Sequence, residues 1–404
     1  MPDSTPPPER VRLDYLAERL GPRLLVVDPS ERLLLVANWA ANQVSGYLID
    51  PATGRLTSAE GSPYDAGIAP RAVTIDPSGR FAYAANWGSG DIVGFRLDSR
   101  GLAPIEGSPF SAGRNPRNLR FDLRGRTAIA SIAGEARLRS YRLDPGTGRL
   151  EPVGEARCLD RPRSAMIDPS GRFVYAAHEG GRAVSGFLIH DATGALTAIE
   201  GSPFPAGRDP RFVTVDFAGR FAWVPNQRSN DLSVFAIDPV TGRLDRTATS
   251  PLSVGRRPFQ AVLFPDGRYC CVANEKSDSL SVFRVDSGTP GAATILLETV
   301  GTGSRPIWPV VDPTGRFLLV ANRESDDLSA WSIDPDGGLD PLAGSPFPAG
   351  RRPRAATVSP SGRFVYLAND GSDSISGWRL DRERVTLIPI PGSPWATGRI
   401  DAVR

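Results

Sequence analysis

The sequence predicts an all-β, single-domain β-propeller of eight four-stranded blades. Three observations favour this fold. A turn of the form Asp-Pro-x-Gly-Arg recurs at intervals of 46 to 48 residues along the chain. Glycine and proline occur 42 and 38 times in 404 residues, which indicates many short strands joined by turns. Forty per cent of the residues are hydrophobic, which is enough to build a packed core.

The repeated turn fixes the number of units. It begins at Asp28, Asp76, Asp122, Asp168, Asp216, Phe264, Asp312 and Ser359. An even period of this length is typical of a repeat architecture, and eight copies predict eight blades, with seven as the alternative. An open solenoid would need distinct polar caps at its two ends. Because the first and last units resemble the middle ones, a closed ring is favoured.

Each unit contains four short apolar stretches, none of which reaches helical length. In the second unit, β-branched and aromatic residues alternate with polar ones, which is the pattern of half-buried strands. The strands expected in this unit cover residues 71–76, 81–85, 92–97 and 102–105. A Gly-Ser-Pro-Phe segment then leads to the next unit.

The propeller is expected to cover residues 23–398. Residues 1–22 are predicted to be a Pro-rich tail with a short amphipathic helix or added edge strand, and residues 399–404 a C-terminal tail. The N-terminus has no apolar segment of a signal peptide or membrane span. Three cysteines do not make a disulfide framework. A cytoplasmic monomer without a membrane partner is therefore expected, and an exported protein that has lost its signal peptide is the alternative.

Charge and motifs exclude several classes of function. The net charge is only +2, and Lys276 is the single lysine, so nearly every cation is an arginine. A codon bias explains this preference, and selection for bidentate anion binding is the alternative. Nucleic acid is not an expected partner, because aromatic single-strand readers are missing. Two histidines and scattered acids give no metal-ligand spacing, and no cofactor is implied.

The repeat predicts a ring of arginines at one mouth of the central channel. The first strand of a propeller blade lines the channel, so the Pro-Arg pair at its start and the Asn at the end of the second strand share one face. The arginines are Arg23, Arg71, Arg117, Arg163, Arg211 and Arg354, with Phe259 and Ile307 in the two remaining units. The asparagine position is interrupted by Ser131 and His178. Since neighbouring guanidiniums repel one another, this mouth is predicted to bind a small anionic molecule.

Catalytic candidates are sought where the units differ. His178, Glu179 and Glu275 are candidate acid or base residues, because histidine titrates near neutral pH and an arginine-rich mouth keeps a carboxylate ionised. The structural alternatives are that His178 replaces the turn asparagine and that the two glutamates are arginine counter-ions. The predicted substrate-binding residues are Arg71, Arg117, Arg163, Arg211, Arg354, Gln260 and Trp308.

Several segments resemble the lactonase-family β-propellers, a group that is similar to the propeller-type 6-phosphogluconolactonases and to fungal muconate cycloisomerase. The segments are Ser-Gly-Arg-Phe-Val-Tyr-Ala-Ala, Asp-Leu-Ser-Val-Phe-Ala-Ile-Asp-Pro-Val-Thr-Gly-Arg-Leu and Gly-Ser-Pro-Phe-Pro-Ala-Gly-Arg. Active members carry Gly-x-x-Pro-Arg-His and a later Asn-Glu. Residues 255–275 match this pattern at Asn274-Glu275 and have Phe259-Gln260 in place of Arg-His.

The resemblance implies a lactonase-like hydrolase that opens a small carboxylated or phosphorylated lactone at the arginine-lined mouth. One arginine would hold the anionic group, a second would stabilise the oxyanion, and His178, Glu179 or Glu275 would move the proton. A non-catalytic propeller that binds a ligand or a protein on the same face is the alternative. A quinone-dependent dehydrogenase is a third hypothesis, which is based on the eight blades and the adjacent Cys270 and Cys271.

Overall fold

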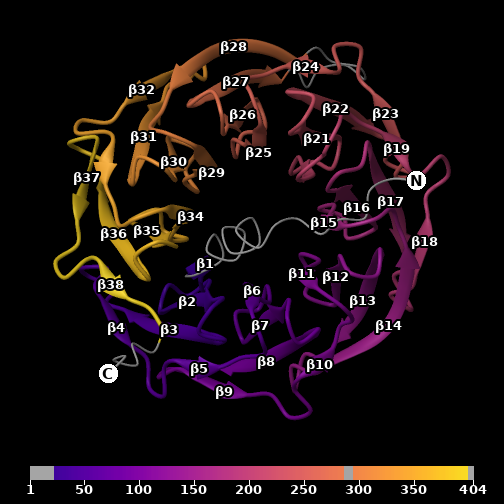
Figure 1. Cartoon of the computed structure of the whole chain (residues 1–404), viewed down its shortest axis with the longest axis horizontal. Coiled ribbons are helices and arrows are strands. Elements are labelled where there is room, and N and C mark those ends of the chain that lie inside the picture. The colour runs from indigo at the N-terminus through magenta and orange to yellow at the C-terminus, as the bar shows by residue number, and fades with distance from the viewer. Residues whose placement is uncertain (1–21, 286–293, 399–404) are drawn as a thin grey trace, which may run out of the picture.

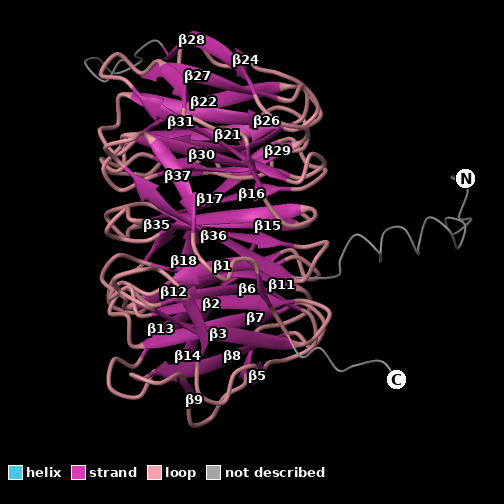
Figure 2. Ribbon diagram, turned by 90° about the vertical axis from the view of Figure 1, so that its left-hand side faces the viewer, coloured by secondary structure: helices cyan, strands magenta, loops and turns pink. Residues whose placement is uncertain are grey.

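The computed structural model describes residues 22–285 and 294–398, which form a closed ring of eight antiparallel sheets (Figure 1). Viewed from the side, the ring is a disc with loops on both faces (Figure 2). The described residues contain strands and no helix. The predicted all-β propeller with eight blades is thus confirmed, and the seven-blade alternative is wrong. The helix or edge strand expected before residue 22 and the tail 399–404 lie outside the described residues.

The two inner strands of each blade are regular and carry most of the core. The first strands, nearest the axis, are β1 (Pro22–Val27), β6 (Pro70–Ile75), β11 (Pro116–Phe121), β15 (Pro162–Ile167), β20 (Thr214–Val215), β25 (Pro258–Leu263), β29 (Pro306–Val311) and β34 (Pro353–Val358). The second strands are β2 (Leu33–Asn38), β7 (Phe81–Asn86), β12 (Thr127–Ile132), β16 (Phe173–His178), β21 (Phe221–Asn226), β26 (Tyr269–Asn274), β30 (Phe317–Asn322) and β35 (Phe364–Asn369).

The third strands are β3 (Gln43–Ile49), β8 (Asp91–Leu97), β13 (Arg137–Leu143), β17 (Ala183–Ile189), β22 (Asp231–Ile237), β27 (Ser279–Val285), β31 (Asp327–Ile333) and β36 (Ser374–Asp381). The outermost strand is continuous in blades 3 and 6, as β14 (Leu150–Arg157) and β28 (Thr294–Gly301).

In the other six blades the outermost strand is split into two pieces that pair with the same third strand. The pairs of pieces are β4 (Leu56–Ser58) with β5 (Tyr64–Asp65), β9 (Leu102–Pro104) with β10 (Phe110–Ser111), β18 (Leu196–Ala198) with β19 (Phe204–Pro205), β23 (Leu244–Arg246) with β24 (Leu252–Ser253), β32 (Leu339–Pro341) with β33 (Phe347–Pro348), and β37 (Thr386–Pro389) with β38 (Trp395–Ala396).

The split strand corrects the expected limits of the blade. The segment after the fourth stretch was expected to be a connection, but in blade 2 its Phe110 pairs with Ile92 of the third strand and is buried. The Ser108 hydroxyl accepts a hydrogen bond from the Gly94 amide at 2.9 Å, which holds the intervening loop against the sheet. Blades 3 and 6 lack this segment, and their outermost strand runs on without a break.

The repeated turn has a physical explanation in the aspartate side chain. In blade 2, the Asp76 carboxylate is buried and accepts hydrogen bonds from the amides of Arg80 and Phe81, at 3.0 and 2.8 Å. Gly79 has φ of 72°, in the left-handed region that favours glycine. In blade 8, Ser359 replaces the aspartate, and its hydroxyl accepts one bond from Phe364 at 3.2 Å.

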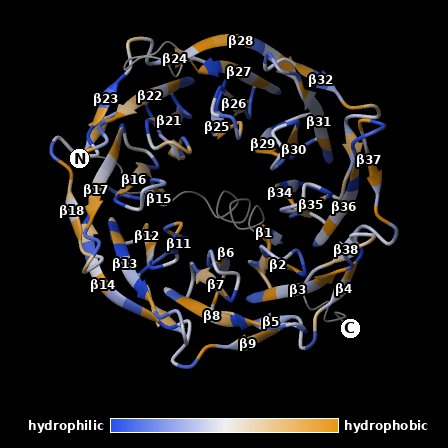
Figure 3. Cartoon of the chain, turned by 180° about the vertical axis from the view of Figure 1, so that it is seen from behind, coloured by the Kyte–Doolittle hydropathy of each residue, from blue (hydrophilic) through white to orange (hydrophobic). Residues whose placement is uncertain are grey.

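The hydrophobic core lies between the blades. Eight clusters of buried apolar residues occur in the described part of the chain, and each combines residues from two adjacent blades. Cys270 and Cys271 show the alternation, because one packs between blades 5 and 6 and the other between blades 6 and 7. Hydrophobic residues accordingly recur around the whole ring (Figure 3).

The ring closes through an ordinary interface between blade 8 and blade 1. Their shared cluster contains Tyr366 and Leu25. The Tyr366 hydroxyl donates a hydrogen bond to the Gly54 carbonyl of blade 1 at 2.7 Å. The same bond, at the same distance, joins Tyr83 of blade 2 to Gly148 of blade 3. Closure therefore needs no strand exchanged between the ends of the chain.

We expect Asp76→Ala to destabilise the protein more than Ser359→Ala. The first change leaves two or more buried amides without an acceptor, which costs about 2 to 4 kcal/mol, whereas the second removes one bond worth about 1 kcal/mol. The shift of the urea unfolding midpoint measures both effects. Equal shifts for the two variants would contradict the role given to the aspartate.

Candidate functional site

In seven of the eight blades, a β-bulge near the start of the first strand turns one side chain into the channel. In blade 2, Pro70 pairs with Asn86 and Ala72 pairs with Ala85, so Arg71 between them has no cross-strand partner. Equivalent register shifts occur in blades 1, 3, 4, 6, 7 and 8. Because a bulge redirects the side chain of its extra residue, the Pro-Arg sequence becomes a ring of arginines around the axis.

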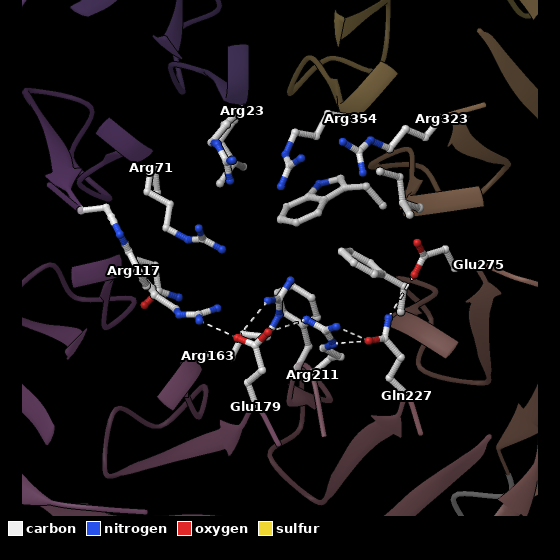
Figure 4. Close-up of a pocket in the computed structure, with 18 of the residues that line it drawn as sticks. Arg23, Arg71, Arg117, Arg163, Glu179, Arg211, Gln227, Glu275, Arg323 and Arg354 are labelled. Carbon is white, nitrogen blue, oxygen red and sulfur yellow. Dashed lines mark hydrogen bonds and ion pairs between the residues drawn. The ribbon is translucent and has the colours of Figure 1, made fainter. Parts of the chain in front are cut away.

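These arginines line a cavity of about 370 Å³ at one mouth of the channel (Figure 4). Among the described residues, the carboxylates that line it are those of Glu179 and Glu275. Its ten arginines are Arg23, Arg71, Arg117, Arg120, Arg163, Arg211, Arg257, Arg305, Arg323 and Arg354. The lining therefore has a large excess of positive charge.

A second ring, which we call the partner ring, surrounds the arginines. It consists of the residue that follows the second strand in each blade, and many of its members contact the arginine of their own blade. The members are Trp39, Trp87, Ala133, Glu179, Gln227, Glu275, Arg323 and Asp370. The partner ring offers tryptophan or alanine in blades 1 to 3 and offers carboxylate, amide or arginine in blades 4 to 8.

Cation–π contacts hold the arginines of the first two blades. The Arg23 guanidinium lies 4.2 Å from the ring centroid of Trp39, and that of Arg71 lies 5.3 Å from the centroid of Trp87. Arg117 contacts the same Trp87 ring at 5.1 Å. A guanidinium stacked on an indole can still point N–H donors that lie in its own plane toward an anion or a carboxylate.

Glu179 is the centre of an ion-pair cluster that adjoins these arginines through Arg117. Its carboxylate lies 2.5 Å from Arg117, 3.2 Å from Arg211 and 3.5 Å from Arg163. Burial alone raises the pKa of Glu179, but the three guanidiniums outweigh burial and lower it to about 2. Glu179 is therefore an anion at neutral pH.

A hydrogen-bonded chain continues from this cluster to Glu275. Arg211 donates from Nε to the Gln227 side-chain oxygen at 2.6 Å, and Gln227 donates to Glu275 at 3.0 Å. Glu275 is also paired with Arg305, which donates from Nε at 3.1 Å. The contacts between Glu179, Arg211, Gln227 and Glu275 are visible in Figure 4. The two glutamates are thus linked through the Arg211 guanidinium and the Gln227 amide.

Burial and mutual repulsion act on the remaining arginines. Burial lowers the pKa of Arg71, and the nearby charges of Arg117 and Arg23 lower it further. The pKa of Arg163 falls for the same reasons, with Arg211 as the largest charged contributor. A bound anion would relieve this repulsion, so the cavity favours negatively charged ligands.

His178, a predicted catalytic residue, lies outside the cavity lining. It is fully buried at the end of β16, and its Nε2 lies 2.8 Å from the hydroxyl of Ser185. Asn38 makes the same contact with Ser45 in blade 1, also at 2.8 Å. Burial lowers the pKa of His178 to about 4. In this position the side chain acts like the asparagine of the other blades.

The structure places the other predicted residues as follows. Trp308 and all five predicted arginines line the cavity, together with Glu179 and Glu275. Gln260 is not among the lining residues, and its side-chain oxygen is buried without a hydrogen-bond partner in the described ranges. The strand register also corrects one position, because Ile132 rather than Ser131 pairs with Pro116 and occupies the asparagine site of blade 3.

Sequence reasoning missed several residues of the site. Arg257 and Arg305 precede the first-strand proline, with φ of 54° and 58°, and their side chains reach the cavity from outside the strand. Arg323 and Gln227 belong to the partner ring. A signal was present, because each follows the end of a second strand by one residue in the same way as Glu179. Arg120 lies deeper in the channel, and no repeat position marks it.

Two further observations bear on the site's chemistry. Within residues 22–285 and 294–398, no three His, Cys, Asp or Glu side chains are grouped so that they could hold a metal ion. None of the described residues form a helix that is long and apolar enough to span a membrane.

Solved structures share the architecture at low sequence identity. A candidate 6-phosphogluconolactonase from Bacteroides uniformis superposes with a TM-score of 0.63 at 17% identity, covering 81% of this chain and 96% of its own. The periplasmic gluconolactonase PpgL of Pseudomonas aeruginosa gives 0.61 at 20% identity, covering 93% and 96%. The Dos1 propeller gives 0.62 at only 9% identity, covering 87% and 90%. These likenesses therefore show the fold alone.

A sequence-family comparison is more specific. No curated protein sequence matches the chain. The model of the family described as lactonase, 7-bladed beta-propeller, matches residues 59–166, 125–206, 161–258 and 309–394, which together are more than half of the chain. The family description gives seven blades, whereas this member has eight. The chain belongs to the lactonase family of β-propellers.

Proposed function

We propose that this protein opens a small carboxylated or phosphorylated lactone in the arginine-lined cavity. This proposal is supported mainly by the charge of the cavity lining, where ten arginines surround two glutamates that already have arginine partners. Asp370 also pairs with Arg323 and Arg354, but the arginines still outnumber the three carboxylates, so the net positive charge favours an anionic substrate. Membership of the lactonase family makes ester-ring hydrolysis the chemistry most consistent with this lining.

The anionic group would dock beside blades 1 and 2, where the partner ring places tryptophans against the arginines. Arg71 is the central donor in this region, because it lies over Trp87 and points into the cavity (Figure 4). A guanidinium offers two parallel N–H groups to a carboxylate or phosphate. Arg117 contacts the same indole and can approach the same anion.

Lactone hydrolysis adds water across the ring ester. The water oxygen bonds to the carbonyl carbon, the ring C–O bond breaks, and the released alkoxide takes up the proton that the water loses. Arg163 would stabilise the oxyanion, because its guanidinium lines the cavity. Arg71 would bind the anionic group of the substrate and so keep the ring ester in position.

The two glutamates receive different roles in this proposal. Glu179, with a pKa of about 2, is a weak base, so its role is to position Arg117, Arg163 and Arg211. Glu275 also lines the cavity and accepts from Gln227 and Arg305. We assign to Glu275 the transfer of the water proton to the leaving oxygen.

A non-catalytic anion-binding propeller is the second candidate. Two observations favour it, namely the ion pairing of both lining glutamates and the position of His178 outside the cavity. The same arginines would then hold a ligand without turnover.

The first prediction about function distinguishes a lactone hydrolase from a non-catalytic anion-binding protein. In a pH-stat with 6-phosphogluconolactone, muconolactone and a carboxylated aryl-fused lactone, Glu275→Gln should lower kcat by about 100-fold or more on the lactone that turns over, because a general base contributes that much. Glu179→Gln should instead act mainly on KM. Anions that raise the melting temperature without turnover of any lactone would favour the binding protein.

The second prediction concerns the anion-binding arginine. Arg71→Ala should weaken binding of inorganic phosphate by about 10- to 100-fold, the value of a charge-assisted hydrogen bond of 1.5 to 3 kcal/mol. Isothermal titration calorimetry measures this change. Arg100→Ala is the matched control, because Arg100 is exposed and pairs with Glu60 away from the cavity. Unchanged affinity in Arg71→Ala would place the anion elsewhere.

The third prediction follows from the lowered pKa of Glu179. Because the folded-state pKa of about 2 lies below the ordinary carboxyl value of 4.5, its ion pairs stabilise the protein fully above about pH 4.5. This contribution, up to about 3 kcal/mol, is lost as the pH falls toward 2. Glu179→Gln should therefore destabilise the protein at pH 7 and much less at pH 3.

Urea unfolding at the two pH values tests this expectation. Glu155→Gln is the control, because Glu155 is exposed in its pairs with Arg137 and Arg139, and an exposed pair contributes about 0 to 1 kcal/mol. A Glu179→Gln effect that stays constant between pH 7 and pH 3 would refute the assigned ion pairs.

A further inference from the structure

Three aromatic side chains form one wall of the cavity. Phe212, Phe259 and Trp308 come from blades 5, 6 and 7 and all line it. The centroid of Phe212 lies 5.5 Å from that of Phe259 and 5.9 Å from that of Trp308. The three side chains are only half-buried, so part of each faces the cavity. We call these residues the aromatic wall.

The backbone directs these residues inward where the repeat is broken. Phe259 occupies the arginine position of blade 6 and lies in the bulge between Pro258 and Ala261. Trp308 lies in the bulge of blade 7 with φ of 58°, a left-handed conformation that is rare for a bulky residue. Such a conformation costs energy and persists where the surroundings or the function require it.

Trp308 reaches across the channel. Its ring meets Phe212 of blade 5 edge-on, at an interplanar angle of 89°, and it also packs against the apolar cluster shared by blades 8 and 1. One side chain from blade 7 therefore contacts blades on both sides of the ring axis. Because Trp308 also lines the cavity, it restricts the space available to a ligand.

The aromatic wall and the cationic lining meet at one residue. The Arg163 guanidinium lies 5.5 Å from the centroid of Phe212 and 5.8 Å from that of Phe259. Arg71 lines the same cavity from blade 2. A ligand in this cavity can therefore present an anionic group to the arginines and an apolar surface to the wall.

The aromatic wall disfavours a ligand that carries many hydroxyl groups. The two phenylalanine rings have no hydrogen-bond donor or acceptor, so hydroxyl groups placed against them would lose water without replacement, which is costly. The ring planes differ by 52° and 89°, so they form no single flat platform on which a sugar face could stack. A flat apolar ring can instead make edge-to-face contacts with several of them.

We infer that the site is specific for an anion with a flat apolar ring, such as an aryl carboxylate or an aryl-fused anionic lactone, held between the arginines and the wall of Phe212, Phe259 and Trp308. This inference rests on the proposed anion-binding function and names its substrate class. The aromatic wall is then the specificity-determining part of the site, and the arginines are its charge-binding part.

Calorimetric binding of 1-naphthoate, gluconate and inorganic phosphate tests the inference. 1-Naphthoate and gluconate carry the same charge, but the first has a flat apolar ring and the second a polyhydroxylated chain. We expect 1-naphthoate to bind at least about tenfold more tightly than gluconate, since aromatic contact and apolar burial exceed 1.4 kcal/mol. Equal affinity, or tighter gluconate binding, would overturn the aromatic specificity.

Variants of the wall locate the effect. Phe259→Arg introduces the residue that six other blades carry at this position, so it is compatible with the fold, and it should weaken 1-naphthoate while strengthening phosphate. Trp308→Ala should weaken 1-naphthoate about tenfold and change phosphate binding less than twofold. Phe217→Ala is the control, because Phe217 is 68% exposed in the turn between β20 and β21, outside the cavity lining.

The outcomes separate this inference from the proposed function. If phosphate binds and a lactone is hydrolysed, but neither wall variant changes the ratio of naphthoate to gluconate affinity, only the aromatic specificity fails. If the wild-type protein binds none of the three anions, the anion site itself is wrong and both proposals fall.

Discussion

Burial of apolar side chains between neighbouring blades is the constraint on which this structure depends. A single four-stranded sheet has two apolar faces, and each cluster in the described chain is shared by two blades. Every blade therefore needs a neighbour on both sides, and the last must meet the first. Tyr366 and Gly54 join blades 8 and 1 as Tyr83 and Gly148 join blades 2 and 3. Ring closure satisfies this requirement without any special device.

In the closed ring, residues at the channel mouth can differ between blades without disturbing the hydrophobic core. Each bulge presents one side chain there, and each second strand ends one residue before a member of the partner ring. The eight blades hold equivalent positions around the mouth. A different residue at one of them, such as Glu179 or Trp308, therefore alters the charge or shape of the mouth and leaves the blades unchanged. The result is a mouth with tryptophans behind its arginines on one side and carboxylates on the other.

Regular features were predictable because they repeat. The turn that contains Asp76 recurs in most units and sets the blade count, and the expected strands of blade 2 agree with the observed ones to within one residue. The arginine ring followed from the Pro-Arg pairs. Prediction failed where a contact depends on the folded structure. The split outer strand at Phe110 requires pairing with the third strand of its own blade, and Arg305 reaches Glu275 from the next blade.

The sequence by itself determined the propeller, its eight blades and the gathering of arginines at one mouth, because each depends on a pattern that repeats along the chain. Only the tertiary structure decided which acids and aromatics meet those arginines. Glu179 collects guanidiniums from three blades, His178 is buried beside Ser185, and Phe212, Phe259 and Trp308 touch although they are far apart in sequence. The physical reason is that contacts across the channel follow from ring closure, which no single repeat encodes.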